Sequence, residues 1–136
     1  MAEEIKEKLA KILKDNTKWP LIIEGVTSKN FPTSIVIPAI TPSSELGIVA
    51  SDTGLKYPSW AMEIMIKYKK SKKVIVCIDG LDKISREEQE NFYGMIKYKG
   101  VNGFKFPEGT QIIITTKNAT KISKRISSLA LSFNVE

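Results

Sequence analysis

The sequence has no histidine and only one cysteine among its 136 residues. Without histidine, histidine-based acid–base catalysis and the common zinc sites are excluded. With one cysteine, an internal disulfide is excluded, and a reducing compartment is the simpler expectation. Because Cys77 lies in the apolar run VIVCI, residues 74–78, we expect its thiol to be buried and unreactive.

Long apolar runs are also missing. No stretch approaches the roughly 18 apolar residues of a membrane-spanning helix. The N-terminal segment MAEEIKEKLAKILKDN alternates charged and aliphatic residues and lacks the apolar centre of a signal peptide. We therefore expect a cytoplasmic protein with no membrane partner. The 42% hydrophobic and 26% charged residues are typical of a globular protein, and residues 1–136 are expected to form a single domain.

Arginine is scarce in an otherwise basic chain. The net charge is +6, but Arg86 and Arg125 are the only arginines, so the excess comes from lysine. Proteins that read nucleic acids usually carry arginine for bidentate contacts. Five lysines are concentrated in one run of seven residues: Lys67, Lys69, Lys70, Lys72 and Lys73. The run is either a solvated helix end or a nucleic-acid-binding patch, which Lys97, Lys99 and Lys105 would extend.

Hydrophobic periodicity predicts alternating helices and strands. Apolar residues at helical spacing predict a first helix of about 14 residues, and continuous apolar runs predict strands at 21–24, 74–78 and 111–115. Further helices are predicted at 60–68, after a capping box of Ser85 and Glu88, and at 121–129. Residues 131–136 are a candidate for one more strand. This alternation favours a three-layer α/β sandwich with a mainly parallel sheet.

Three segments are less regular. Residues 33–40 could be a helix opened by Pro32, but the β-branched run and Pro38 favour an edge strand. Residues 41–58 are rich in loop-forming residues, with a brief strand expected at 47–50. Residues 97–109 contain Asn102-Gly103 between short alternating stretches, which predicts a β-hairpin.

The order of these elements resembles that of a known family. A buried strand ends at Asp79, a helix and the hairpin follow, and a second buried strand ends near Asn118. Residues 72–123 resemble the region from Walker B to sensor 1 of AAA+ ATPases and are most similar to the MoxR-like and midasin-like group. Residues 51–65 resemble the segment that leads into Walker B there. The resemblance implies a P-loop NTPase-like fold, here without the helical lid domain of the family.

The resemblance assigns roles to residues after the two buried strands. Asp79 matches the Walker B aspartate, which can hold Mg²⁺ through water. The glutamate that polarises the attacking water should follow it, and Gly80 stands there instead. Asp82 lies at the wrong position to replace that glutamate. Asn118 matches the sensor 1 residue, which could orient a water near a phosphate, and both Asp79 and Asn118 have plain turn formation as an alternative role.

The Walker A loop and the arginine finger are matched less well. A Walker A loop needs G-x-x-x-x-G-K-[ST], so that backbone N–H groups wrap the phosphates and a lysine reaches them. After the strand at 21–24 the chain has GVTSKNFP, residues 25–32. The candidate vestigial nucleotide-binding residues of this loop are Gly25, Thr27, Ser28 and Lys29. A solvated loop lysine is the favoured interpretation of Lys29. Ser132 precedes Phe133 where the family carries its arginine finger.

We therefore expect a catalytically inactive ATPase-like domain, a pseudo-ATPase, that serves as a protein-binding or assembly module. It would bind a protein partner or associate with itself. No catalytic residue, cofactor or metal is expected, unless ATP binds and brings Mg²⁺ to Asp79. Two alternatives stay open. One is an unorthodox ATP-binding AAA+ ATPase that uses Lys29, Asp79 and Asn118, and the other is a small basic nucleic-acid-binding protein whose fold is incidental.

Overall fold

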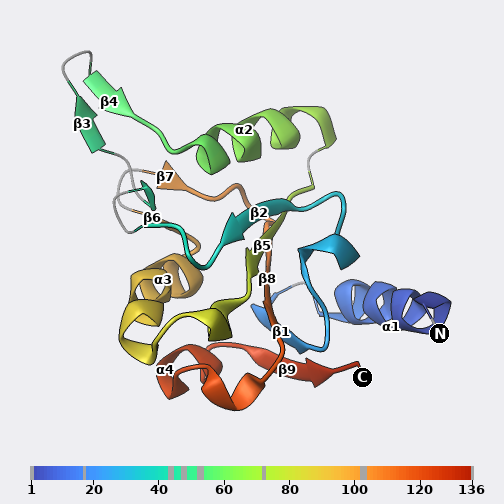
Figure 1. Cartoon of the computed structure of the whole chain (residues 1–136). Coiled ribbons are helices and arrows are strands. Elements are labelled where there is room, and N and C mark those ends of the chain that lie inside the picture. Colours follow the sequence, from blue (N-terminus) through green and yellow to red (C-terminus); the bar gives the residue numbers. More distant parts are fainter. Residues whose placement is uncertain are drawn as a thin grey trace.

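A parallel β-sheet forms the centre of the protein. The computed structural model describes residues 2–16, 18–42, 45–46, 49–51, 54–71, 73–101 and 104–135. Within that part, five strands form one sheet in the order β2-β5-β8-β1-β9, and all neighbours are parallel (Figure 1). The strands are β1 (Leu21–Glu24), β2 (Ile35–Pro38), β5 (Ile75–Asp79), β8 (Gln111–Thr116) and β9 (Leu131–Asn134). The predicted parallel sheet is confirmed.

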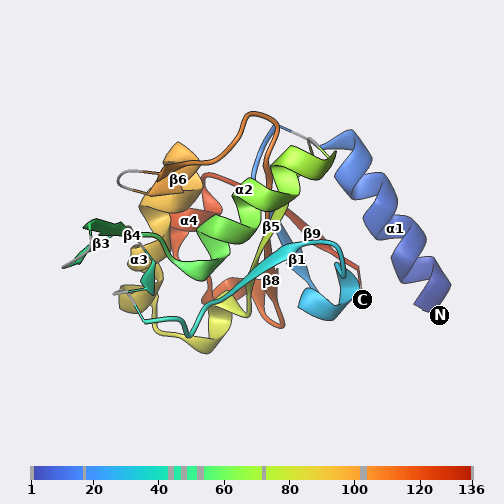
Figure 2. The same cartoon turned by 90° about the horizontal axis from the view of Figure 1, so that it is seen from above.

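Helices cover both faces of this sheet. On one face lie α2 (Ser59–Ser71), α3 (Arg86–Tyr98) and α4 (Lys124–Ser127), which connect β2, β5, β8 and β9 in turn. On the other face lies α1 (Ala2–Asp15), and Figure 2 shows it across the strands from α3 and α4. The arrangement is the predicted three-layer α/β sandwich. No helix in the described ranges has the length and apolar character needed to span a membrane.

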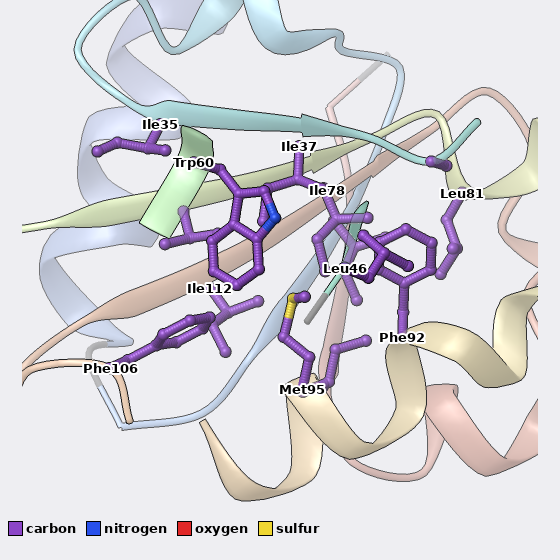
Figure 3. Packing of buried hydrophobic residues seen from close by; sticks show 14 of the residues in the cluster. Ile35, Ile37, Leu46, Trp60, Ile78, Leu81, Phe92, Met95, Phe106 and Ile112 are labelled. Atoms are coloured by element: carbon purple, nitrogen blue, oxygen red, sulfur yellow. The ribbon is translucent and has the colours of Figure 1, made fainter. Parts of the chain in front are cut away.

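The larger hydrophobic core lies between the sheet and α2 and α3. Successive strand residues point to opposite faces, so alternate isoleucines of the strands reach this core. They meet the aromatic and methionine side chains of the helices, as Figure 3 shows for Ile37, Ile78, Ile112, Trp60, Phe92 and Met95. The Trp60 indole N–H also donates to the Glu45 carbonyl at 3.1 Å. Trp60 and Phe92 are thus packing residues of this core.

A smaller core lies on the opposite face, beneath α1. Leu9 of α1, Phe31 of the connection after β1 and Cys77 of β5 are buried there together. Burial raises the pKa of the Cys77 thiol to about 12; the Asp79 carboxylate adds to this rise, and a hydrogen bond with Ser34 opposes it. A thiol with so high a pKa carries almost no reactive thiolate at neutral pH. Cys77 is therefore a packing residue, in agreement with its apolar sequence context.

Two of the local sequence signals are realised in detail. The Ser85 side chain accepts the N–H of Glu88 at 3.1 Å, and the Glu88 side chain accepts the N–H of Ser85 at 3.4 Å, which completes the predicted capping box. Residues 33–40 contain the edge strand β2 rather than a helix. The Ala39 N–H points inward to the Asp79 carbonyl at 2.9 Å. Because N–H groups alternate along a strand, Pro38 occupies an outward position, where no hydrogen bond is lost.

The hairpins differ from their predicted extents. β3 (Val49–Ser51) pairs with β4 (Gly54–Lys56), whereas the sequence predicts only one brief strand at 47–50, of which residues 47–48 lie outside the described part. β4 is missed because glycine and lysine have low strand propensity. β6 (Gly100–Val101) and β7 (Phe104–Lys105) form the hairpin predicted within 97–109. The Asn102-Gly103 turn itself lies outside the described residues.

The helices also differ in length. α2 extends beyond the predicted 60–68 at both ends, and α3 continues to Tyr98 because Lys99 adopts the left-handed cap conformation at φ 54°. The helix predicted at 121–129 is the four-residue α4, preceded by a turn of 3₁₀-helix, η4 (Ala119–Lys121). The two are separate because the Ser123 hydroxyl caps α4 by accepting the N–H of Ile126 at 3.3 Å.

Candidate functional site at the carboxyl edge of the sheet

The carboxyl ends of β1 and β8 lie at the point where the direction of chain crossing reverses. From β1 the chain passes to β2 over the α1 face, where Phe31 is buried. From β8 it passes to β9 over the opposite face, where Ile126 of α4 is buried. In open α/β sheets, ligands bind at such a switch point, outside the carboxyl ends of the strands. The residues that the resemblance assigns to nucleotide binding lie at this edge.

Asp79 is the centre of the polar groups at this edge. Its Oδ1 accepts the Ser28 N–H at 2.9 Å and the Thr115 hydroxyl at 2.7 Å, and its Oδ2 accepts the Ser28 hydroxyl at 3.3 Å. The carboxylate therefore ties the connection after β1 to the ends of β5 and β8. Both of its oxygens are engaged by donors of the protein itself. Thr115 is not among the predicted site residues, although it lies at the carboxyl end of a predicted buried strand.

The connection after β1 is too short to be a phosphate-binding loop followed by a helix. Residues 25–34 contain a single turn of 3₁₀-helix, η1 (Ser28–Asn30), before β2 begins, as the short link between β1 and β2 in Figure 1 shows. A phosphate site at a helix N-terminus uses backbone N–H groups that no protein acceptor occupies. A helix long enough to supply such a terminus is not formed between β1 and β2.

The backbone N–H groups of this connection are used internally. Gly25 donates to the Thr116 carbonyl at 3.0 Å, and Thr27 donates to the Asn30 side chain at 3.1 Å. Within the turn, N–H groups of η1 and Phe31 donate to the Thr27 hydroxyl, the Thr27 carbonyl and the Ser28 carbonyl. Together with the Ser28–Asp79 bond, six of the seven residues from Gly25 to Phe31 thus have a protein acceptor for their N–H. Thr27 and Asn30 form a capping box, which holds the turn closed.

The position that follows Asp79 is built for glycine. Gly80 has φ 74°, a left-handed conformation that costs a residue with a side chain roughly 1–2 kcal/mol. A Cβ atom placed there would lie 2.9 Å from Cδ of Lys83. The Gly80 N–H donates to the Thr115 hydroxyl at 3.0 Å, and this bond holds Gly80 in the left-handed conformation. The catalytic glutamate of the family therefore could not stand at this position without backbone strain.

The remaining residues of the edge hold turns and strands together. The Asn118 side chain caps η4 by accepting the Thr120 N–H at 3.1 Å. Glu24, which sequence reasoning missed, accepts the Ala119 N–H at 2.7 Å through Oε1 and the Asn134 amide at 2.6 Å through Oε2. Its signal in the sequence was a carboxylate at the end of a buried strand. Lys29 is exposed on the short turn of η1.

These contacts decide which group the edge could hold. Magnesium-bound nucleotide needs unoccupied carboxylate and hydroxyl oxygens for the metal and free N–H groups for the phosphates. Here the carboxylate of Asp79, the hydroxyl of Ser28 and the N–H groups of the turn bind one another. In the described part of the chain, no three histidine, cysteine, aspartate or glutamate side chains are grouped to hold a metal ion. The residues present do not fit a magnesium–phosphate group.

The other candidate residues lie away from this edge. The lysine run is at the C-terminal end of α2, where Lys69, Lys70 and Lys73 are exposed and Lys67 is half-buried, while Lys72 lies outside the described residues. Arg125 of α4 pairs with Glu90 of α3 at 2.9 Å. Ser132 is an exposed residue of β9. The structure therefore joins Ser28 and Asp79 directly, while Gly25, Thr27 and Lys29 lie in the same connection as Ser28 and Asn118 caps the turn after β8.

Replacement of Asp79 by alanine is expected to destabilise the fold by about 2–4 kcal/mol, because three donors lose a charged acceptor. Asp82→Ala is the matched control, since Asp82 accepts the exposed Lys117 N–H at 3.2 Å and no second bond to its side chain is formed within the described ranges. Its loss is expected to cost less than about 1 kcal/mol. Urea unfolding of both variants measures the difference. Equal losses would contradict the central role given to Asp79.

Alanine at two glycines should change stability in opposite directions. Gly80→Ala is expected to destabilise the protein by about 1 kcal/mol, because the left-handed conformation is strained for alanine. Gly94→Ala in α3 is expected to stabilise it by about 0.5–1 kcal/mol, because nothing lies within 4 Å of the added Cβ and alanine favours a helix. Thermal unfolding of the two variants tests this, and a stabilising Gly80→Ala would disprove the proposed constraint.

Comparison with known proteins supports the fold and says nothing about the chemistry of the site. No protein-family model and no curated protein matches the sequence. Among solved structures, a RuvB mutant from Thermotoga maritima matches with a TM-score of 0.50 and 12% sequence identity. The match covers 96% of this chain and 45% of the RuvB chain, so this chain spans less than half of its length. Such low identity shows the fold alone. The protein has an AAA+ ATPase-like fold of the P-loop type.

Proposed function

We propose that this chain is a pseudo-ATPase domain, related to the MoxR-like and midasin-like group, that does not hydrolyse nucleotide and acts as a protein-binding or assembly module. The observation that carries the first half is the internal use of the N–H groups from Gly25 to Phe31. A nucleotide would have to break these bonds before the phosphates could bind. The binding energy would then be spent on opening the turn.

The missing catalytic groups support the same conclusion. Gly80 supplies no carboxylate to polarise water, and Ser132 supplies no cation for a neighbouring active site. Each electrostatic contact of this type is worth about 3–4 kcal/mol to a transition state. The loss of several such contacts leaves little of the rate enhancement of an ATPase.

Exposed apolar side chains support the second half of the proposal. Met62 and Ile66 are 46% and 53% exposed and lie four residues apart, on one stripe of α2. Ile40, just after the edge strand β2, is 70% exposed. Contiguous apolar side chains at a surface mark protein contacts when the patch is large, and the adjacent side chains of Met62 and Ile66 are where we expect such a patch on α2. A second copy of the chain is the simplest partner to test.

Thermal unfolding with and without millimolar Mg-ATP tests the first half. We expect no shift of the unfolding midpoint, because the N–H groups that would bind the phosphates already have protein acceptors. Binding would be detectable, since a ligand at one hundred times its dissociation constant stabilises a fold by about 2.7 kcal/mol. Lys29→Ala and Asn118→Ala serve as controls. A shift that both variants abolish would establish the alternative, an ATP-binding protein that uses Lys29, Asp79 and Asn118.

Sedimentation velocity over a range of protein concentrations tests the second half. We expect the average mass to rise with concentration and Ile66→Asp to keep the protein monomeric, because a carboxylate buried in an apolar contact is costly. Glu63→Ala on the same helix removes an exposed acidic side chain and should leave the association unchanged. A wild-type protein that stays monomeric would rule out self-association through α2.

A further inference from the structure

Two large aromatic side chains are exposed at the amino edge of the sheet, opposite the Asp79 edge. Trp19 precedes β1 and is 61% exposed, and Tyr98 ends α3 and is 69% exposed. The other tryptophan, Trp60, is only 5% exposed. Leaving an indole and a phenol ring in water forgoes burial energy of about 1.5–3 kcal/mol for a side chain of this size. Two such rings exposed on segments that lie close together are a candidate contact surface.

The two aromatic residues lie in segments that touch each other. Lys99, the cap of α3 next to Tyr98, extends its Nζ to the carbonyl oxygen of Lys18, next to Trp19, at 3.4 Å. The segment is also held in place from β9, since the Leu131 N–H donates to the Pro20 carbonyl at 2.9 Å. The segments that carry Trp19 and Tyr98 are therefore neighbours in space, and we name the exposed residues on them, with Lys18, Lys97 and Lys99, the Trp19–Tyr98 surface.

Cations lie beside the rings of Tyr98 and of its neighbour Tyr93. Lys97 Nζ lies 5.4 Å from the ring centre of Tyr98 and 5.6 Å from that of Tyr93, within the range of cation–π contacts. The Arg125 guanidinium lies 4.0 Å from the Tyr93 ring centre and pairs with Glu90. Hydrogen bonding by Arg125 and then by Lys97 lowers the pKa of the Tyr93 phenol. Lys97 thus lies beside the exposed Tyr98 ring, while Lys18 and Lys99 are the chain neighbours of Trp19 and Tyr98 and meet through the Lys99 Nζ.

We propose that the Trp19–Tyr98 surface binds single-stranded nucleic acid, with bases stacked on Trp19 and Tyr98 and phosphates held by Lys18, Lys97 and Lys99. Alternating aromatic faces and basic side chains are the arrangement with which proteins hold single strands without reading their sequence. The phosphates of RNA and DNA share this chemistry. This inference goes beyond the proposed function and does not depend on the Asp79 edge.

A single strand fits this surface better than a duplex does. Bases in a duplex are stacked on one another, so exposed tryptophan and tyrosine rings would have no base face to contact. Sequence-specific reading relies largely on bidentate arginine contacts, and the chain has only two arginines, of which Arg125 is paired with Glu90. The lysine run of α2 is also basic, but aromatic side chains as exposed as Trp19 and Tyr98 do not accompany it.

The first test measures fluorescence anisotropy of labelled oligothymidine, oligouridine and a mixed-sequence duplex mixed with the whole chain. We expect both single strands to bind more tightly than the duplex. If three phosphates are neutralised, the affinity for a single strand should fall roughly 20-fold between about 50 and about 200 mM salt. Tighter binding of oligouridine would identify RNA as the preferred ligand, and tighter binding of oligothymidine would identify DNA.

Variants locate the binding surface. Trp19→Ala and Tyr98→Ala should each weaken single-strand binding by about 10-fold, since one stacked base is lost. The double variant Lys18→Gln/Lys97→Gln should weaken binding and flatten its salt dependence. Lys69→Gln/Lys70→Gln is the matched control, because it removes the same charge from an exposed part of α2 and should have little effect. Intrinsic fluorescence should be quenched on binding through Trp19 and not through the buried Trp60, so Trp19→Ala should abolish the quenching.

Four results of the binding measurements would overturn the proposal, and one result of sedimentation would do so as well. They are no binding of either single strand at about 50 mM salt, tighter binding of the duplex, equal losses in the two lysine double variants, and unchanged quenching in Trp19→Ala. A Trp19→Ala variant that changes the sedimenting mass and leaves oligonucleotide affinity unchanged would show that the surface is a protein contact instead. Circular dichroism of each variant confirms that the fold is intact before binding is compared.

Discussion

The carboxylate of Asp79 is the contact on which the carboxyl edge of the sheet depends. It joins three segments that are distant in the sequence, through Ser28, through Thr115 and through its own place on β5. In a nucleotide hydrolase, a carboxylate at this position faces a metal ion. Here the protein supplies the donors itself, so the charge is satisfied without a ligand. Glu24 does the same for β1 and β9 by binding the Ala119 N–H and the Asn134 amide.

This closure explains why the connection after β1 can be so short. A phosphate-binding loop needs free N–H groups and a helix to present them. The turn at Ser28–Asn30 has used most of its N–H groups in its own capping box and in the bond to Asp79. Phe31 then enters the core under α1, which holds the chain against the sheet. The same few residues thus close the edge and pack the second face.

The two ends of the sheet therefore differ in character. The carboxyl edge is a network of short hydrogen bonds in which polar groups already have partners. The amino edge exposes Trp19 and Tyr98 beside lysines. Helices between parallel strands run back from the carboxyl edge to the amino edge, and α3 accordingly delivers Tyr98 there. The fold therefore does not fix what either edge does, because that depends on the side chains placed there.

The sequence by itself determined the local features of this protein. Periodicity and spacing along the chain are enough to recognise them, because each depends on residues that are neighbours in the sequence. They are the apolar runs at 21–24, 74–78 and 111–115, the capping box at Ser85 and the absence of a glutamate after Asp79. Only the tertiary structure decided which polar groups have hydrogen-bond partners within the protein. Ser28 meets Asp79 across 51 positions, and Lys99 meets Lys18 across 81. Such contacts arise only when the strands are ordered in the sheet, because a side chain's partner is set by spatial neighbours and not by sequence neighbours.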